Sequence, residues 1–130
     1  MWEVQAKKDS KLGRFHRRHD KPFVNITRRG IIFNKEFLKK FDLKRGDCVI
    51  IMWDKVSNRV GFRAAKTATE QDIGYKLSAL GKSAHCSALI CDKFTGKLPA
   101  DCLDKFYLAS LPAGGTIITV NLYEVHVHAA

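Results

Sequence analysis

The order of predicted elements in residues 23–66 occurs again in residues 87–130, and this repetition limits the folds open to the chain. In the first segment, β-branched and aromatic residues at 23–27 and 31–33 predict two strands. Gly30, in the turn between them, permits a positive φ angle. The segment therefore begins as a tight hairpin.

A short helix and two more strands complete the first segment. Asn34 is a good N-cap, and Phe37, Leu38 and Phe41 form one apolar stripe. Strands at 48–53 and 59–63 follow, joined by a hairpin loop at 54–58.

The second segment reads in the same way. A strand at 87–91 precedes a turn at 92–96, and Lys97-Leu98 returns as a short strand. Pro99 suits the first turn of a helix, whose apolar stripe is Cys102, Leu103 and Phe106. A loop at 111–115 and a β-branched strand at 116–123 end the segment.

When the sequence is aligned with itself at an offset of 65 residues, the first predicted helix falls on the second. Leu38, Lys40, Phe41 and Leu43 then match Leu103, Lys105, Phe106 and Leu108. Two such units can close a small barrel and remove open sheet edges. We therefore predict a mainly β fold with short helices: a small barrel built from two β-β-α-β repeats.

The remaining segments predict an arm and a connector. Residues 1–22 show no sustained period and form a basic N-terminal arm. Residues 67–86 are rich in Ala, Ser, Thr and Gly and connect the repeats at 23–66 and 87–130. Within the connector, the apolar residues from Ile73 to Leu80 fit either a strand or a turn.

The segment from Ile32 to Ile51 resembles the AbrB-type swapped-hairpin unit, in which a short strand enters a helix and Gly-Asp (here Gly46-Asp47) precedes a long strand. Leu98-Pro99-Ala100-Asp101-Cys102-Leu103 is similar to a second, weaker copy. Asn34 replaces the family's usual proline, and Asp47 has no acidic counterpart in the second copy of this alignment. The resemblance implies an AbrB-like, cradle-loop or double-psi barrel, with two copies in one chain as in the MraZ arrangement.

AbrB-like proteins are mostly DNA-binding regulators or antitoxins that contact DNA around the first hairpin turn. The resemblance carries that role to Arg28 and Arg29, with Asn25 and Thr27 on the same approach. The second copy offers Asp92, Lys93 and Thr95 there, which is a poor site for an anion.

The charge distribution independently favours a polyanionic partner. Residues 1–66 hold 18 Lys/Arg against 7 Asp/Glu, whereas residues 67–130 hold 5 against 6. Such self-repulsion is best tolerated beside a phosphate backbone, and arginine suits phosphate oxygens and guanine edges. The alternative is a solvated arm that only aids solubility. The candidate nucleic-acid contacts are Arg14, Arg17, Arg18, Lys21, Asn25, Thr27, Arg28 and Arg29.

Metal and catalytic chemistry find little support in the sequence. His126 and His128 lie on one face of a strand and, with His85 or Cys86, could hold zinc, but no Cys-x-x-Cys pair exists. The motifs of serine hydrolases, P-loop proteins and dinucleotide-binding proteins are absent. We expect no cofactor, no metal and no enzymatic activity; Cys91 with His85 would form a catalytic pair only by accident of packing.

The expected function is a DNA-binding transcription regulator. RNA remains open as the nucleic acid, as does a homodimer in which repeats pair between chains. The rival is a protein-interaction module, antitoxin-like or a phage-type accessory factor, favoured by the neutral second half and by aromatics such as Phe94 and Tyr107 near its loops. No apolar run long enough for a membrane span or a secretory signal is present, so we expect a cytoplasmic protein.

Overall fold

A computed structural model describes residues 21–80 and 86–125 of the chain. They form a nine-stranded antiparallel sheet in the order β5-β3-β4-β9-β8-β1-β2-β7-β6. The strands of the first half are β1 (Phe23–Ile26), β2 (Gly30–Phe33), β3 (Cys48–Asp54) and β4 (Arg59–Ala64). Those of the second half are β5 (Tyr75–Lys76), β6 (Ser78–Ala79), β7 (Ser87–Ile90), β8 (Lys105–Ser110) and β9 (Ile118–Val125).

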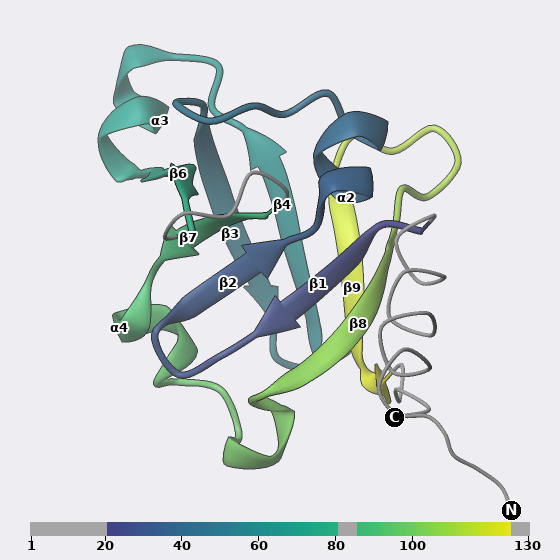
Figure 1. The fold of residues 1–130 in the computed structure, drawn as a ribbon. Helices are drawn as coiled ribbons and strands as arrows, with labels where there is room; N and C mark the ends of the chain where they lie inside the picture. Colours follow the sequence, from purple (N-terminus) through teal and green to yellow (C-terminus); the bar gives the residue numbers. More distant parts are fainter. Residues whose placement is uncertain (1–20, 81–85, 126–130) are drawn as a thin grey trace, which may run out of the picture.

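The sheet curls into a nearly closed barrel (Figure 1). Its two terminal strands, β5 and β6, are separated only by Leu77, so one short segment pairs with β3 on one side and with β7 on the other. Backbone bonds from Gly46 N to Leu77 O (2.8 Å) and from Leu77 N to Asp47 O (2.8 Å) fix this closing segment. The connector predicted from composition therefore supplies the strand that closes the barrel, together with helix α3 (Ala68–Ile73).

The pairing pattern is the same when the two halves are exchanged. The exchange replaces β1 by the β5/β6 segment, β2 by β7, β3 by β8 and β4 by β9, and the reverse. It turns β2–β7 and β4–β9 into themselves and every other strand pair into a different observed pair. The starts of β2 and β7, residues 30 and 87, are 57 positions apart, and so are the starts of β3 and β8, residues 48 and 105. Pairs of strands from the two halves thus alternate around the barrel instead of forming separate lobes.

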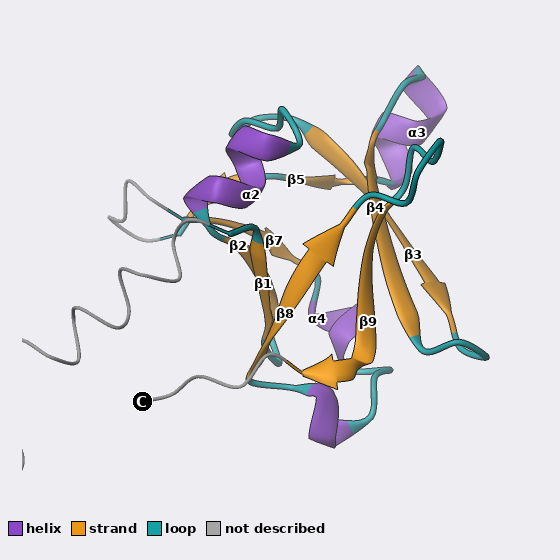
Figure 2. Cartoon of the chain, turned by 90° about the vertical axis from the view of Figure 1, so that its right-hand side faces the viewer, coloured by secondary structure: helices purple, strands orange, loops and turns teal. Residues whose placement is uncertain are grey.

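Two helices occupy opposite ends of the barrel. Helix α2 (Lys35–Lys40) lies at one end, whereas α4 (Asp92–Thr95) and the 3-10 turn η2 (Ala100–Cys102) lie at the other (Figure 2). The prediction for α2 is confirmed: Asn34 Oδ1 accepts the Phe37 N–H at 2.9 Å, and Phe37 is the buried residue of the helix. We call the end that carries α4 the α4 end.

The prediction of a second helix over residues 99–106 is wrong. Only Ala100–Cys102 are helical, and β8 begins at Lys105. Asp104 adopts a positive φ of 60°, which breaks the turn, and its N–H bonds to Ile26 O at 2.6 Å, so the chain enters β8 between β1 and β9. Likewise, Lys97-Leu98 is not a strand, because Leu98 N bonds to Thr95 O directly after α4.

The 65-residue alignment fails for the same reason: it places helix α2 on residues 100–105, of which only 100–102 are helical, and it places Phe41 and Leu43 on Phe106 and Leu108 of strand β8. At the observed separation of 57, helix α2 falls on α4, and Phe37, Lys40 and Asp47 fall on the identical residues Phe94, Lys97 and Asp104. Asp47 therefore has an acidic counterpart at this offset.

The barrel interior holds one continuous apolar core. Alternate residues of each strand point inward, and large side chains with no exposed surface include Tyr107, Phe33, Phe37, Phe62, Ile26 and Ile31. Tyr107 is buried, so the expectation that it is an exposed aromatic near the loops is wrong. Its hydroxyl donates to Cys102 O at 2.6 Å, and burial raises the pKa of the phenol.

Helix α3 is held to the barrel by an ion pair. The two terminal guanidinium nitrogens of Arg63 on β4 donate to the Glu70 carboxylate, at 2.9 and 2.7 Å. The Lys66 backbone N–H donates to Glu70 Oε1 at 2.8 Å. The Arg63 hydrogen bond is the main cause that lowers the pKa of Glu70 to about 2.

We expect the Glu70→Gln variant to lose the part of the acid sensitivity that this pair provides. A carboxyl group whose pKa is lower in the folded state stabilises the fold above its unfolded pKa, and that stabilisation is lost as the pH falls through the folded pKa. Urea unfolding midpoints of the unaltered chain should therefore fall between about pH 5 and pH 2 by more than those of Glu70→Gln. Equal slopes for the two proteins over that range would contradict the assignment.

Candidate nucleic-acid interface

The turn between β1 and β2 is closed by the side chain of Thr27. Thr27 N donates to Gly30 O at 2.8 Å, Thr27 Oγ1 donates to the same oxygen at 3.0 Å, and Gly30 N donates back to Thr27 Oγ1 at 3.2 Å. Thr27 therefore shapes the turn rather than presenting a free hydroxyl to a partner.

Gly30 is needed at this turn, but not for the reason the sequence suggested. The glycines of the described residues with positive φ are Gly46 and Gly114, and Gly30 is not among them. Instead, a Cβ at Gly30 would overlap the carbonyl oxygen of Leu89 on the neighbouring strand β7. Close approach of two backbones, not an unusual dihedral angle, requires glycine here.

Helix α4 anchors the backbone of the turn from outside the hairpin. Thr95, a fully buried residue, donates its hydroxyl to Arg28 O at 2.6 Å, and Cys91 N donates to Arg29 O at 3.1 Å. Sequence reasoning missed this role of Thr95, since 67 residues separate it from Arg28 and no local pattern relates them.

The side chains of Arg28 and Arg29 extend from this anchored turn. Both residues are exposed, and within residues 21–80 and 86–125 no hydrogen bond or ion pair engages either guanidinium. Two adjacent arginines therefore project from a backbone held by Thr27, Cys91 and Thr95, and guanidinium groups are suited to phosphate oxygens.

The other predicted contacts lie apart from this pair. Lys21 precedes β1 at the α2 end, where its carbonyl accepts from Asn34 Nδ2 at 2.8 Å, so the length of β1 separates it from Arg28. Asn25 lies within β1 between Ile32 and Phe106, and its buried Oδ1 has no partner among the described residues. Arg14, Arg17 and Arg18 lie outside the described residues.

A hollow of about 720 Å³ opens at the α4 end. Sequence reasoning did not single it out, because its walls come from the ends of β3 and β9, from η2 and from the start of β8. Three lysines line it, Lys55, Lys97 and Lys105, with the aromatic rings of Trp53 and Tyr123. A basic and aromatic surface of this kind suits an anion attached to a flat ring.

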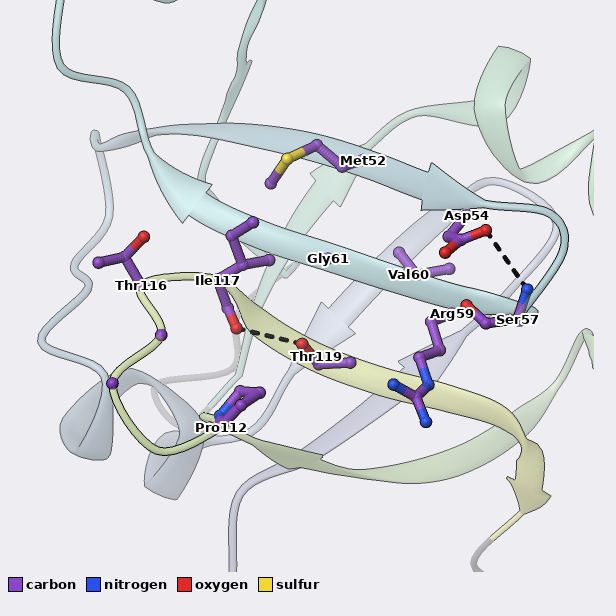
Figure 3. A pocket seen from close by; sticks show the side chains of 12 residues that line it. Met52, Asp54, Ser57, Arg59, Val60, Gly61, Pro112, Thr116, Ile117 and Thr119 are labelled. Carbon is purple, nitrogen blue, oxygen red and sulfur yellow. Dashed lines mark hydrogen bonds between the residues drawn. The ribbon is translucent and has the colours of Figure 1, made fainter.

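A second hollow, of about 530 Å³, lies on the outer face of β3, β4 and β9 beside the 112–117 loop (Figure 3). Two of its polar groups bond within local structure: the Asp54 carboxylate accepts from Ser57 N at 3.3 Å, and Thr119 Oγ1 donates to Ile117 O at 3.1 Å. The bonds from Ser57 lower the pKa of Asp54. An ionised Asp54 carboxylate has no proton to give as a general acid. The Thr119 hydroxyl donates its proton to a backbone carbonyl and is not activated as a nucleophile.

Cys91 and Cys102 are not activated as nucleophiles. Cys91 and Cys102 are buried, and burial raises the pKa of both thiols, that of Cys91 to about 11. A protonated, buried thiol packs as a small apolar group. The histidines considered above for a zinc site and for a catalytic pair lie outside the described residues. They are His85, His126 and His128. In the part of the chain that the structure describes, no three His, Cys, Asp or Glu side chains gather to hold a metal.

No protein-family model, curated protein or solved structure matches this chain. In the described ranges, none of the helices combines the length and the apolar character that crossing a bilayer requires.

Proposed function

We propose that this protein binds duplex DNA through the β1–β2 turn and the basic arm, and acts as a cytoplasmic transcription regulator. The observation that carries the proposal is the exposed Arg28–Arg29 pair, which has no acidic partner among the described residues and stands on a turn fixed by Thr27, Cys91 and Thr95. The buried Thr95 hydroxyl bonds to the Arg28 carbonyl and so limits the motion of the turn. A turn held in this way favours defined contacts with DNA over non-specific electrostatic attraction. The arm adds sequence-independent affinity.

The strand pairing supports an AbrB-like ancestry for the barrel. Two β-β-α-β-β units, each with its helix after the second strand, interlock so that β2 pairs with β7 and β4 with β9. Interlocked hairpins are the arrangement that the AbrB resemblance implies, here within one chain. Because a single chain already supplies both units, exchange between two chains of a homodimer is not needed to close the barrel.

A protein-interaction module is the second candidate, and one observation favours it. Ile90 on β7 and Leu108 on β8 are 63% and 43% exposed on the outer face of the sheet, with β1 and β2 between them. Such exposed apolar side chains offer separate contact points to a protein partner, as an antitoxin-like or phage-type accessory factor would require. The experiment below separates the two candidates, since the rival predicts no affinity for duplex DNA that depends on Arg28 and Arg29.

The test is a double substitution, Arg28→Ala with Arg29→Ala, in the full chain. Fluorescence anisotropy with a labelled random duplex of about 20 base pairs should show a loss of about tenfold in affinity at low salt, with the salt slope reduced by about 2, because two phosphate contacts are removed. The exposed pair Lys39 and Lys40 on α2, replaced by alanine, is the matched control, since it removes the same charge at the other end of the barrel. An unchanged dissociation constant, or an equal loss in the control, would overturn the assignment.

A further inference from the structure

The hollow at the α4 end combines a flat aromatic surface with a ring of cations. Tyr123 is 73% exposed, and no aromatic ring among the described residues stacks on it. Leu98, Pro99 and Leu122 add apolar surface to the same hollow. A planar ligand can therefore replace water over the tyrosine ring and along this apolar surface.

The Trp53 ring is held in place in the wall of the hollow. Its edge-to-face contact with Phe94 of α4 has a centroid distance of 6.0 Å, and Lys55 Nζ lies 5.6 Å from a Trp53 ring centroid. The Lys55 ammonium lies near this ring, and the Lys55 side chain stays exposed. The Trp53 ring thus forms a packed part of the wall, whereas Tyr123 in the same lining is exposed.

The charges of the hollow favour an anion. Lys55, Lys97 and Lys105 come from three different segments, and among the described residues of the lining Asp101 is the one acidic residue. Lys55 and Lys97 are exposed, so their ammonium groups are free to reach a ligand. Three lysines around aromatic rings match the phosphates on either side of a single base better than they match a lone inorganic anion, which would leave the rings uncovered.

The geometry points to a binding site for an unpaired nucleotide: a base stacked on Tyr123, with its flanking phosphates held by Lys55, Lys97 and Lys105. In a duplex the faces of the bases are covered by their neighbours, so the site takes single-stranded DNA or RNA. This inference rests on the proposed function and names a further nucleic-acid form that the protein recognises.

The site lies next to the arginine turn. Helix α4 joins the two, because Thr95 bonds to Arg28 and Phe94 contacts Trp53. Exposed Lys93 and Lys97 at the start and just beyond the end of this helix offer phosphate contacts between the two sites. A strand that separates from a duplex bound at Arg28 and Arg29 can reach the hollow across α4, so the protein should favour duplexes with a single-stranded extension.

The test uses labelled (dT)10 and (U)10 with the full chain, measured by anisotropy at low salt. Tyr123→Ala should weaken binding by between about fivefold and a hundredfold, the range for loss of one stacked base. Its matched control is Ile73→Ala on α3, an apolar residue of similar exposure (68%) near the other end of the barrel. The two oligomers differ in the 2′-hydroxyl and in the thymine methyl group, so (dU)10 is added to separate the two. The ratio of the dissociation constants of (dU)10 and (U)10 then tells which sugar the site prefers.

The charge contribution is tested separately. Lys97→Gln should weaken (dT)10 binding and reduce its salt slope by about 0.7, whereas Lys76→Gln, an exposed lysine paired with the first residue of β3, should not. Both Tyr123 and Lys97 are exposed, so these variants should keep the unfolding temperature of the unaltered chain.

Each outcome decides the matter. Loss of single-strand binding in Tyr123→Ala and Lys97→Gln, with duplex binding retained, supports the site. Duplex binding without measurable (dT)10 or (U)10 binding, or an unchanged affinity in Tyr123→Ala, overturns this inference and leaves the proposed function standing. Absence of binding to both nucleic-acid forms overturns the proposed function as well.

Discussion

The Gly30→Ala substitution is expected to destabilise the protein by about 3 kcal/mol or more, because its new methyl group would occupy the position of the Leu89 carbonyl oxygen. This oxygen belongs to the backbone of β7, so it cannot rotate away as a side chain could. Ile90 Cα, 3.2 Å from the same Cβ, blocks movement along the strand. Strands β2 and β7 would have to separate at the seam where the two halves of the barrel pair.

The measurement is chemical unfolding of Gly30→Ala beside Gly61→Ala. Gly61 also lies buried in a strand, but a methyl group there meets Ile117 Cγ2 at 2.6 Å, a side-chain atom next to a loop. We expect a loss of about 1 kcal/mol for Gly61→Ala, since a side chain yields more readily than a backbone. Equal losses for the two variants would show that the close approach of β2 and β7 is not what requires Gly30.

The same substitution bears on function. Moving β2 away from β7 would also displace Arg29, whose carbonyl bonds to Cys91 N beside β7. At a temperature where Gly30→Ala remains folded, its duplex affinity should fall as that of the arginine double variant does. Duplex affinity equal to that of the unaltered chain would show that the anchoring of the turn does not matter for binding.

Replacing Phe37 by alanine is expected to cost about 3–5 kcal/mol of stability, the range for removal of a buried phenyl ring. The Phe37 ring stacks on Phe33 at a centroid distance of 4.1 Å and meets Phe41 edge-to-face at 4.9 Å. Phe37 has no exposed surface and is the residue through which α2 closes its end of the barrel. Its loss would leave a cavity between the helix and the strands that the rigid barrel cannot fill.

Phe41→Ala on the same helix segment is the matched control. Phe41 is only partly buried at the edge of the core, so its truncation should cost clearly less than that of Phe37. Phe37→Leu should restore most of the stability because it refills much of the volume. If Phe41→Ala proved as damaging as Phe37→Ala, the assignment of Phe37 as the central contact of α2 would be wrong.

The local elements of the first half could be predicted because their signals lie within a few residues of one another. Asn34 caps α2, and the spacing of Phe37 and Phe41 places both rings on one face of the helix. The turn at Arg28 and Arg29 is equally local. A cap, an apolar stripe and a turn each depend on short-range bonds, so the residues themselves contain the information.

The second half was misassigned where local and long-range signals compete. Leu103 and Phe106 have a helical spacing, yet β1 and β9 leave a gap that only an extended segment can fill, and β8 fills it with hydrogen bonds on both sides. The backbone bonds of β8 to two distant strands outweigh the weak helical preference of a six-residue pattern. The 57-residue offset between the two halves could not be read from the sequence, because the halves share their pattern of strand pairing but few identical residues at that offset.

The sequence by itself determined that the chain is mainly β, that α2 forms after Asn34, and that two arginines stand at the first turn. Each of these follows from propensities and spacings that act over one or two turns of chain. The tertiary structure decided which strands are neighbours, why Gly30 is required, and that Lys55, Lys97 and Tyr123 surround one hollow. Those facts depend on backbone pairing between segments tens of residues apart, and such pairing is set by closure of the whole barrel rather than by any stretch of it.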